Sequence, residues 1–347
     1  MSIKTTKTKY YTATRALSYG TPFIYSLGNR SIGKTFDWTC RCINNWKRKR
    51  KKFIYMRRYD EDLKRVAPSF FDNVQFKYPS DQFEVHGTGK SGTIFKINGE
   101  QAGISISLST ALKYKSVGFA DYDIILFDEF LPEDGRYLPN EVSTALNFYQ
   151  SVARGYGEVI RKDVKFVFLA NNVTMFNPYF IDLHILEQCH PGTHYTCDPD
   201  RAWVVEIINN EAVAEEIAST PFGKMIAKTK YGDYALKSAF YLDSNIFIEK
   251  PTGDNKYYCT LVSRGKKYGV YEYTKEGLFY ISEKYDPKHP AVFSLTTEDH
   301  KPNYIMLYRN AQNGLFSLLK FAYDNACIRF QNGLCKAMFL EFMAYSI

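Results

Sequence analysis

The sequence predicts an α/β fold, with a central, mainly parallel sheet covered by helices on both faces and a smaller α+β domain after it. Three features indicate this. Up to about residue 203, short apolar runs rich in β-forming residues alternate with amphipathic helical stretches. A glycine-containing loop at residues 28–35 lies between the first such run and the first helix. From about residue 247 the pattern becomes that of successive hairpins.

The composition limits the class of protein. The chain has 347 residues, enough for two domains with separate cores, and its 45% hydrophobic content predicts a packed globular protein. The formal net charge of +8 favours an anionic partner such as nucleic acid or a membrane surface. No apolar run is long enough to span a bilayer, and the N-terminus lacks the apolar segment of a secretory signal. Seven scattered cysteines fit reduced thiols in a cytoplasmic compartment better than a disulfide framework.

The first elements surround the loop. The run TPFIYSL at residues 21–27 is typical of a buried strand. The stretch after the loop has apolar side chains at helical spacing, namely Phe36, Cys40, Ile43 and Trp46. The basic run KRKRKK at residues 47–52 has two open interpretations: a solvated helix end favoured by the helix dipole, or a contact with DNA phosphates.

The later elements follow the same alternation. A helix over part of residues 60–74 is expected to break near Pro68, and Asn140 can cap a helix that ends near residue 154. Further strands are expected at residues 53–58, 123–130 and 164–172, with a hairpin and one more strand within residues 83–109. At the C-terminal end we expect three alternating strands within residues 257–283 and two closing helices.

The changes in pattern predict three parts. We expect residues 1–205 to form the first domain, which contains the loop, residues 206–240 a helical linker, and residues 241–347 the second domain.

The loop GNRSIGKT matches the phosphate-binding pattern G-x-x-x-x-G-K-[ST] at each fixed position. Its glycines let backbone N–H groups turn toward phosphate oxygens, Lys34 reaches the β- and γ-phosphates, and the Thr35 hydroxyl binds Mg²⁺. The strand before it and the helix after it are the context that this motif requires. The sequence therefore predicts ATP and Mg²⁺ as ligands, with ATP held by Gly28, Asn29, Arg30, Ser31, Ile32, Gly33, Lys34 and Thr35.

Two acids end the strand at residues 123–130. Asp128 can hold Mg²⁺ through water, and Glu129 can polarise the attacking water. Paired acids at a strand end also occur as structural caps, but the apolar run before them and the loop upstream weaken that interpretation. An acid beside the metal-binding Asp128 indicates hydrolysis. At least one strand is expected between the loop and these acids, which suits ATPases that move along polymers. We therefore expect residues 1–205 to be a P-loop (ASCE-type) ATPase domain.

Hydrolysis also needs positive charge on the developing γ-phosphate. Arg154 is a candidate arginine finger, Arg161 is another, and Lys115 could serve as a second cation. Any single Arg or Lys is more often a solvated surface residue. Arg30 lies within the loop itself and must therefore be near the phosphates.

Five blocks of sequence carry a family resemblance. In this order and spacing, GNRSIGKT, FIYMRRY, IILFDEF, YLPNEVSTALNF and LANNVTMFNPYF resemble the genome-packaging ATPases of phi29-like tailed phages. The resemblance covers residues 18–180 well and continues more weakly to the C-terminus. The long blocks are far more specific than the phosphate loop alone.

The resemblance implies a homo-oligomeric ring, a pentamer in this family, that threads double-stranded DNA through a portal into an empty procapsid in the host cytoplasm. It implies that Arg154 acts in trans, that Lys115 also reaches a neighbour's nucleotide, and that Asn171 senses the γ-phosphate and couples it to movement. It also implies a second domain like RNase H that has lost nuclease activity. The segment after Arg154 is longer and less basic than the family pattern, which leaves Arg161 as the alternative finger.

Other interpretations remain at this stage. The chain could be a helicase-like ATPase, an active terminase that cuts DNA, or a nucleotide-binding switch that only docks DNA or capsid. An active nuclease would need clustered carboxylates, and the available acids, which form no defensible pattern, are Asp243, Glu249 and Asp254. A zinc site is conceivable at Cys189, His190, His194 and Cys197, but the spacing lacks the paired C-x-x-C of structural sites.

Overall fold

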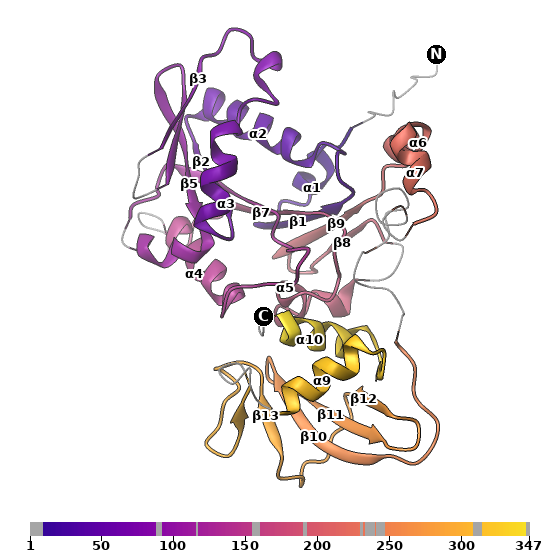
Figure 1. Cartoon of the computed structure of the whole chain (residues 1–347). Helices are drawn as coiled ribbons and strands as arrows, with labels where there is room; N and C mark the ends of the chain where they lie inside the picture. Colours follow the sequence, from indigo (N-terminus) through magenta and orange to yellow (C-terminus); the bar gives the residue numbers. More distant parts are fainter. Residues whose placement is uncertain are drawn as a thin grey trace. The chain divides into compact units, whose positions relative to one another are not determined.

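The described residues of the computed structural model fall into two compact units (Figure 1). The description covers residues 10–87, 92–115, 117–154, 160–189, 193–229, 232, 240, 247–307 and 314–344. The first unit holds the described residues of Met1–Leu131, Asn140–Thr174 and His184–Tyr241, and the second those of Pro132–Pro139, Met175–Leu183 and Leu242–Ile347. Two short segments that are flanked in sequence by the first unit therefore belong to the second unit.

A large, mainly parallel sheet forms the centre of the first unit. Its order is β3-β4-β5-β2-β6-β7-β1-β9-β8. The six strands from β5 to β9 in this order run parallel, and the antiparallel pairs lie at the two edges. The strands are β1 (Phe23–Gly28), β2 (Lys52–Arg57), β3 (Phe83–Gly87), β4 (Thr93–Ile97), β5 (Glu100–Ser107), β6 (Tyr122–Asp128), β7 (Lys165–Ala170), β8 (Tyr195–Cys197) and β9 (Trp203–Ile208).

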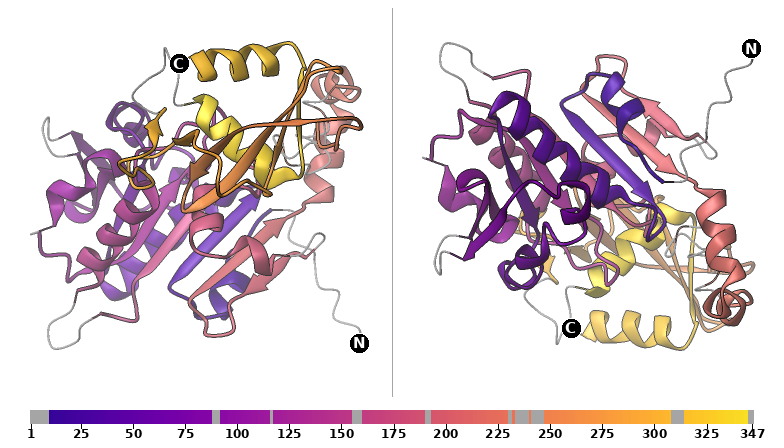
Figure 2. Two further views of the ribbon diagram at one scale, coloured as in Figure 1. Left: turned by 90° about the horizontal axis from the view of Figure 1, so that it is seen from below. Right: turned by 90° about the horizontal axis from the view of Figure 1, so that it is seen from above.

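The helices of the first unit cover both faces of the sheet (Figure 2). They are α1 (Thr14–Ser18), α2 (Lys34–Lys49), α3 (Asp60–Val66), α4 (Glu141–Ala153), α6 (Glu211–Ser219) and α7 (Pro221–Ile226). Short 3₁₀ turns lie at η1 (Ala67–Ser69), η2 (Gln75–Lys77), η3 (Leu108–Tyr114) and η4 (Leu186–Gln188). Within the described ranges, no helix combines the length and the apolar character that crossing a membrane requires.

Alternation along the central strands explains why both faces are apolar. On β1, Ile24 faces the core that α2 covers, where Trp38 is buried. The next residue, Tyr25, faces the other side and stacks on Phe168 with ring centroids 4.5 Å apart. On that side Tyr149 of α4 stacks on Phe166 of β7. The parallel strands thus read as continuous apolar runs, as the sequence predicted.

The second unit is built on a smaller sheet with the order β14-β13-β10-β11-β12-β15. Strands β10 (Lys256–Ser263), β11 (Lys266–Tyr273) and β12 (Leu278–Ser282) form an antiparallel meander. Strand β13 (Val292–Ser294) runs parallel to β10, and β14 (Ile305–Met306) runs parallel to β13. Strand β15 (Ile328–Phe330) runs parallel to β12. The helices of this unit are α5 (Pro178–Asp182), α9 (Gly314–Asp324) and α10 (Gly333–Ala344), and α9 and α10 pack against β12 and β15.

The structure agrees with the predicted large parallel sheet and places β7 between β1 and β6, so that one strand separates the loop from the acids. The expectation for Asn140 needs correction. It is the N-cap residue of α4, but its φ is 55° and its side chain makes no capping hydrogen bond. The three-part division stays a prediction. Strand β9 runs to Ile208, past the expected boundary at 205, and residues 230, 231, 233–239 and 241–246 lie outside the described residues.

A buried ion pair fixes the chain that leaves β6. Arg58 donates through Nε and Nη2 to the two carboxylate oxygens of Glu141 at 2.7 and 2.9 Å, and both residues are buried. Its Nη2 also donates to the carbonyl of Phe130 at 2.5 Å. One guanidinium therefore joins the end of β2, the chain after the acids and the first turn of α4.

Glu141→Gln should destabilise the first unit by about 3 kcal/mol, because it leaves the Arg58 cation buried without its charged partner. The measurement is chemical denaturation followed by tryptophan fluorescence, which reports on the first unit alone because Trp38, Trp46 and Trp203 all lie there. Lys64→Ala breaks the exposed Lys64–Asp60 pair and should leave the midpoint unchanged. Equal midpoints for the two variants would mean that the Arg58 pair does not hold this region.

Candidate active site

The glycines of the loop are required for two different reasons. Gly33 is the N-cap of α2 with φ 94°, a conformation that favours glycine. A Cβ at Gly28 would lie 2.6 Å from Cδ1 of Ile32 and 2.9 Å from Cβ of Ile208. Gly33 therefore supplies a backbone conformation, whereas Gly28 supplies space for the loop to close over the end of β1.

Lys34 points back into its own loop. Its ammonium donates to the carbonyls of Gly28 at 2.7 Å and Asn29 at 2.8 Å. Burial lowers the pKa of Lys34 to about 8, although the carboxylates of Asp128 and Glu206 oppose that shift. A triphosphate would offer this cation the anionic partner that the carbonyls do not supply.

A buried acid that the sequence analysis missed lies close to the loop. Glu206 on β9 is level with Ser26 on β1 in the sheet register, and it accepts a hydrogen bond from the Ser26 hydroxyl at 2.5 Å. The Tyr11 hydroxyl also donates to Glu206, and the Tyr11 N–H donates to the Ile32 carbonyl at 2.9 Å. Burial raises the pKa of Glu206. The signal in the sequence was an acid within the apolar run WVVEII.

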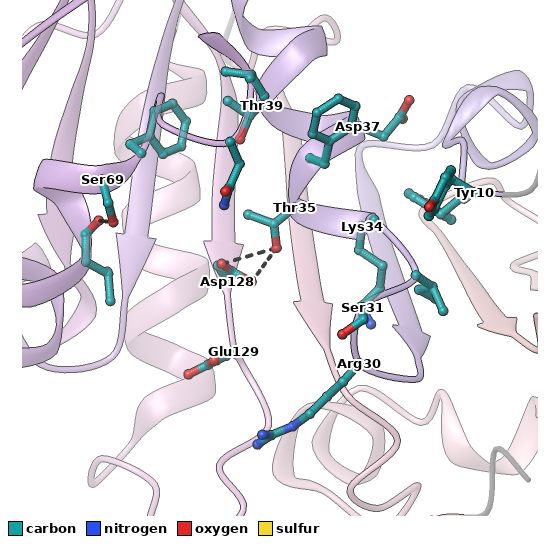
Figure 3. A pocket seen from close by; sticks show the side chains of 18 of the residues that line it. Tyr10, Arg30, Ser31, Lys34, Thr35, Asp37, Thr39, Ser69, Asp128 and Glu129 are labelled. Carbon is teal, nitrogen blue, oxygen red and sulfur yellow. Dashed lines mark hydrogen bonds between the residues drawn. The ribbon is translucent and has the colours of Figure 1, made fainter. Parts of the chain in front are cut away.

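Asp128 and Thr35 lie together at the carboxyl ends of the strands (Figure 3). The Thr35 hydroxyl is 3.4 Å from each carboxylate oxygen of Asp128. The Tyr55 hydroxyl donates to Asp128 at 3.3 Å. A hydroxyl beside a carboxylate is the hard oxygen donor set that Mg²⁺ prefers, so these residues fit the predicted ion.

Arg57, at the end of β2, bridges the two acids. Its guanidinium donates to Asp128 at 3.1 Å and forms an ion pair with Glu129. Burial alone would lower the pKa of Arg57, but the charge of Asp128 and further anionic neighbours raise it above its usual value. Arg57 was also missed, although two arginines ending a buried strand were a visible signal.

Glu129 differs sharply from Asp128 in its environment. Asp128 is buried, whereas the side chain of Glu129 is 63% exposed. The φ of Glu129 is 58°, because the chain turns immediately after β6. The turn places one carboxylate beside the Thr35 hydroxyl and leaves the next exposed at the pocket.

A pocket of about 1100 Å³ contains the loop and both acids. Asn171, after β7, also lines it, and so do the aromatic side chains of Tyr10 and Phe76. The neighbouring Asn172 is buried, and its amide donates to Oδ1 of Asn29 at 3.1 Å. The predicted site residues that line this pocket are Arg30, Ser31, Ile32, Gly33, Lys34, Thr35, Asp128, Glu129 and Asn171.

The three candidate cations lie apart from this pocket. Arg154 and Lys115 are exposed and follow α4 and η3, which pack against each other. Arg161 is largely buried, and its guanidinium donates to the carbonyls of Ala120, Tyr122 and Val152. These bonds hold the Arg161 side chain against the chain at the start of β6 and the end of α4.

The basic run at residues 47–52 is partly neutralised within the first unit. Lys47 pairs with Asp81 at 2.5 Å, Arg50 with Glu100 at 3.1 Å and Lys52 with Asp121 at 3.9 Å. The run therefore presents less free positive charge than its sequence indicates.

The other ionisable candidates form no metal centre in the described residues, where no cluster of three His, Cys, Asp or Glu side chains could hold a metal ion. His190 and Asp243 lie outside the described residues. Glu249 pairs with Arg329 at 3.7 Å, and Asp254 pairs with Lys275 at 3.2 Å.

The chain matches the family model of the podovirus DNA encapsidation protein (Gp16) over residues 5–346. It is 31% identical over 337 residues to the DNA packaging protein of Bacillus phage phi29, with 96% of this chain and 97% of that protein covered. It is similar to a chain of the bacteriophage phi29 viral genome packaging motor assembly, with a TM-score of 0.67, 29% identity, and coverage of 98% of this chain and 100% of the other. It also resembles the N-terminal domain of the DNA packaging ATPase of bacteriophage phi29, with a TM-score of 0.51, 29% identity, and coverage of 58% of this chain and 98% of that domain.

Binding of ATP should weaken as the pH rises through about 8, where the free protein loses the Lys34 proton. Bound phosphate favours the charged ammonium, so the nucleotide-bound form has the higher Lys34 pKa and each binding event above pH 8 must take up a proton. Affinity should then fall toward tenfold per pH unit, as measured by calorimetry between pH 7 and pH 9.5. Lys34→Ala should bind weakly with a flat profile, and an equally steep profile in that variant would assign the proton to another group.

Proposed function

Because the chain belongs to the podovirus DNA encapsidation protein family, we propose that it is an ATPase that drives double-stranded viral DNA through a portal into a procapsid. The observation that carries this proposal is the meeting of the phosphate loop, Thr35, Asp128 and Glu129 in one pocket. A helicase would use the same site, but the similarity to phi29 packaging proteins over almost the whole chain favours packaging.

The roles of the pocket residues follow from their positions. Backbone N–H groups of the loop and the Lys34 ammonium bind the β- and γ-phosphates of ATP. Thr35 and Asp128 hold Mg²⁺, which neutralises developing charge on the phosphates when it is bound. Glu129 is the exposed carboxylate of the pair and orients the attacking water. The Arg57 ion pair fixes Glu129, so Glu129 must leave this pair, or turn within it, to reach water.

Two asparagines directly after β7 lie beside the loop. Strand β7 lies between β1 and β6, so residues directly after it face both the loop and the acids. Asn171 lines the pocket, and Asn172 is hydrogen-bonded to Asn29. We assign γ-phosphate sensing to Asn171. Its neighbour Asn172 links the same strand end to the loop through the side chain of Asn29.

The charge that completes the site comes from a neighbouring subunit. Arg154 and Lys115 are both exposed cations on packed elements, which suits residues that act across a boundary. Arg154 is the finger in this arrangement, because the Arg161 side chain is occupied by backbone carbonyls. The subunits accordingly form a ring that hydrolyses ATP at its interfaces while docked at the portal, in the host cytoplasm.

The second unit is an RNase H-like domain without nuclease activity. Its support is the strand order, a three-stranded meander with β13 parallel to β10 and β14 parallel to β13. The central strand β10 carries no Asp or Glu. Asp299, near β13, accepts hydrogen bonds from the N–H groups of Arg264 and Gly265 and is thereby used to hold a turn. This domain contacts DNA without cutting it.

Purified protein should hydrolyse ATP, and double-stranded DNA should stimulate the rate under conditions where the chain assembles. Lys34→Ala should abolish hydrolysis because it removes phosphate binding, whereas Glu129→Gln should bind ATP but not turn it over. The assay measures phosphate release and nucleotide binding for the three proteins. Turnover by Lys34→Ala near the wild-type rate would remove the chain from the phosphate-loop ATPases.

Arg154→Ala should lower turnover by about 10³-fold with little effect on ATP binding, as expected for an arginine finger. Mixing it with Glu129→Gln should restore activity above the sum of the two proteins alone, because some interfaces then pair an intact Glu129 with a neighbour's intact Arg154. The matched variant Arg161→Ala should lower stability rather than give such rescue. No gain in rings shown to contain both variants would exclude Arg154 as a finger in trans.

A further inference from the structure

The segment Met175–Leu183 belongs to the second unit, although the first unit supplies the residues on both sides of it. It begins four residues after Asn171, which lines the nucleotide pocket. Just before it, the buried Asn172 is hydrogen-bonded to Asn29 of the loop. The polypeptide thus passes directly from the nucleotide pocket into the second unit.

An aromatic contact fixes the start of this segment. A Cβ at Gly333, the first residue of α10, would lie 2.4 Å from Cζ and 2.5 Å from Cε2 of Phe176. The ring of Phe176 therefore rests against the backbone of α10, in space that a side chain at position 333 would need. Asn177 then caps α5, since its Oδ1 accepts from the Phe180 N–H at 3.1 Å. The segment is held as a short rigid element.

An arginine fixes the other end of the segment. Nη1 of Arg264 donates to Asp182, the last residue of α5, at 2.6 Å. Its Nη2 and Nε donate to the two carboxylate oxygens of Glu341 on α10, at 2.5 and 3.3 Å. The Arg264 side chain is only 18% exposed, so these charge-assisted bonds are largely shielded from water.

The position of Arg264 is itself constrained by the β10–β11 hairpin. Arg264 and Gly265 form a two-residue turn with φ 52° and 73°. The carboxylate of Asp299 accepts both of their backbone N–H groups at 2.7 Å. Through this turn, α5 is tied to the two longest strands of the second sheet as well as to α10.

We propose that Met175–Leu183 transmits the nucleotide state to the second unit and that Arg264 is the positioning residue that couples it to the DNA-contacting sheet. This rests on the proposed function. ATP at the loop adds an anionic partner for Lys34 beside the carbonyls of Gly28 and Asn29, and Asn29 accepts a hydrogen bond from Asn172. A shift there moves a chain whose next residues are anchored at Phe176 and Asp182. Hydrolysis needs the pocket and the neighbour's cation but not the anchors, whereas DNA movement needs the anchors as well.

The test compares Asp182→Asn with wild type in full-length packaging complexes. Asp182→Asn keeps the shape of the side chain but removes the charge that Arg264 binds. ATP hydrolysis should stay within about twofold of wild type, while the length of DNA moved per ATP should fall by about fivefold or more. Asp182→Glu keeps the charge and should recover most of the length of DNA moved per ATP. Asp254→Asn, which breaks the exposed pair with Lys275 in the same unit, should leave both rates unchanged.

Hydrogen exchange gives a second readout that does not depend on packaging. A non-hydrolysable ATP analogue should change the exchange of β10 and β11 in wild type, and this change should be absent in Asp182→Asn and in Gly333→Ala, which crowds Phe176. An unchanged ratio of DNA moved to ATP, or an equal response of β10 and β11 in all proteins, would overturn the proposal. If the wild-type protein did not hydrolyse ATP at all, that result would instead count against the proposed function.

Discussion

The carboxylate of Asp128 is the group around which the first unit is arranged. It is buried at the end of β6, and its partners come from two other elements: Thr35 at the start of α2, and Tyr55 and Arg57 on β2. A buried carboxylate is costly unless polar groups surround it. Strands β1, β6 and β2 must therefore end at the same level, and the alternating apolar faces of the sheet keep them there.

The same electrostatic balance continues beneath the loop. The Lys34 cation lies among the carboxylates of Asp128 and Glu206, and it closes the loop by binding two of its carbonyls. Glu206 in turn orders the N-terminal segment through Tyr11, whose N–H binds the loop at Ile32. The loop is thus shaped before a nucleotide arrives, which reduces the ordering that binding requires.

Two strands of the pocket lead directly into the second unit. The chain after β6 reaches Pro132–Pro139, and the chain after β7 reaches Met175–Leu183, and both segments belong to that unit. The acids and Asn171 are therefore close along the chain to the unit that we propose contacts DNA. This connectivity offers a direct mechanical route, because packed elements transmit small displacements with little loss.

Local patterns were sufficient to predict the strand and the helix on either side of the loop at residues 28–35, the strand that leads to Asp128 and Glu129, the mainly parallel sheet and the C-terminal hairpins. Backbone geometry and side-chain periodicity act over a few neighbouring residues, so they are legible in the order of the amino acids. The roles of Arg57 and Glu206 were not legible, because each depends on what faces it across strands that are distant in sequence. The same holds for the carbonyls that occupy Arg161 and for the packing of Met175–Leu183 with α10. Only the tertiary structure determined which groups these residues contact, because the charge or polarity of a residue does not specify its partner.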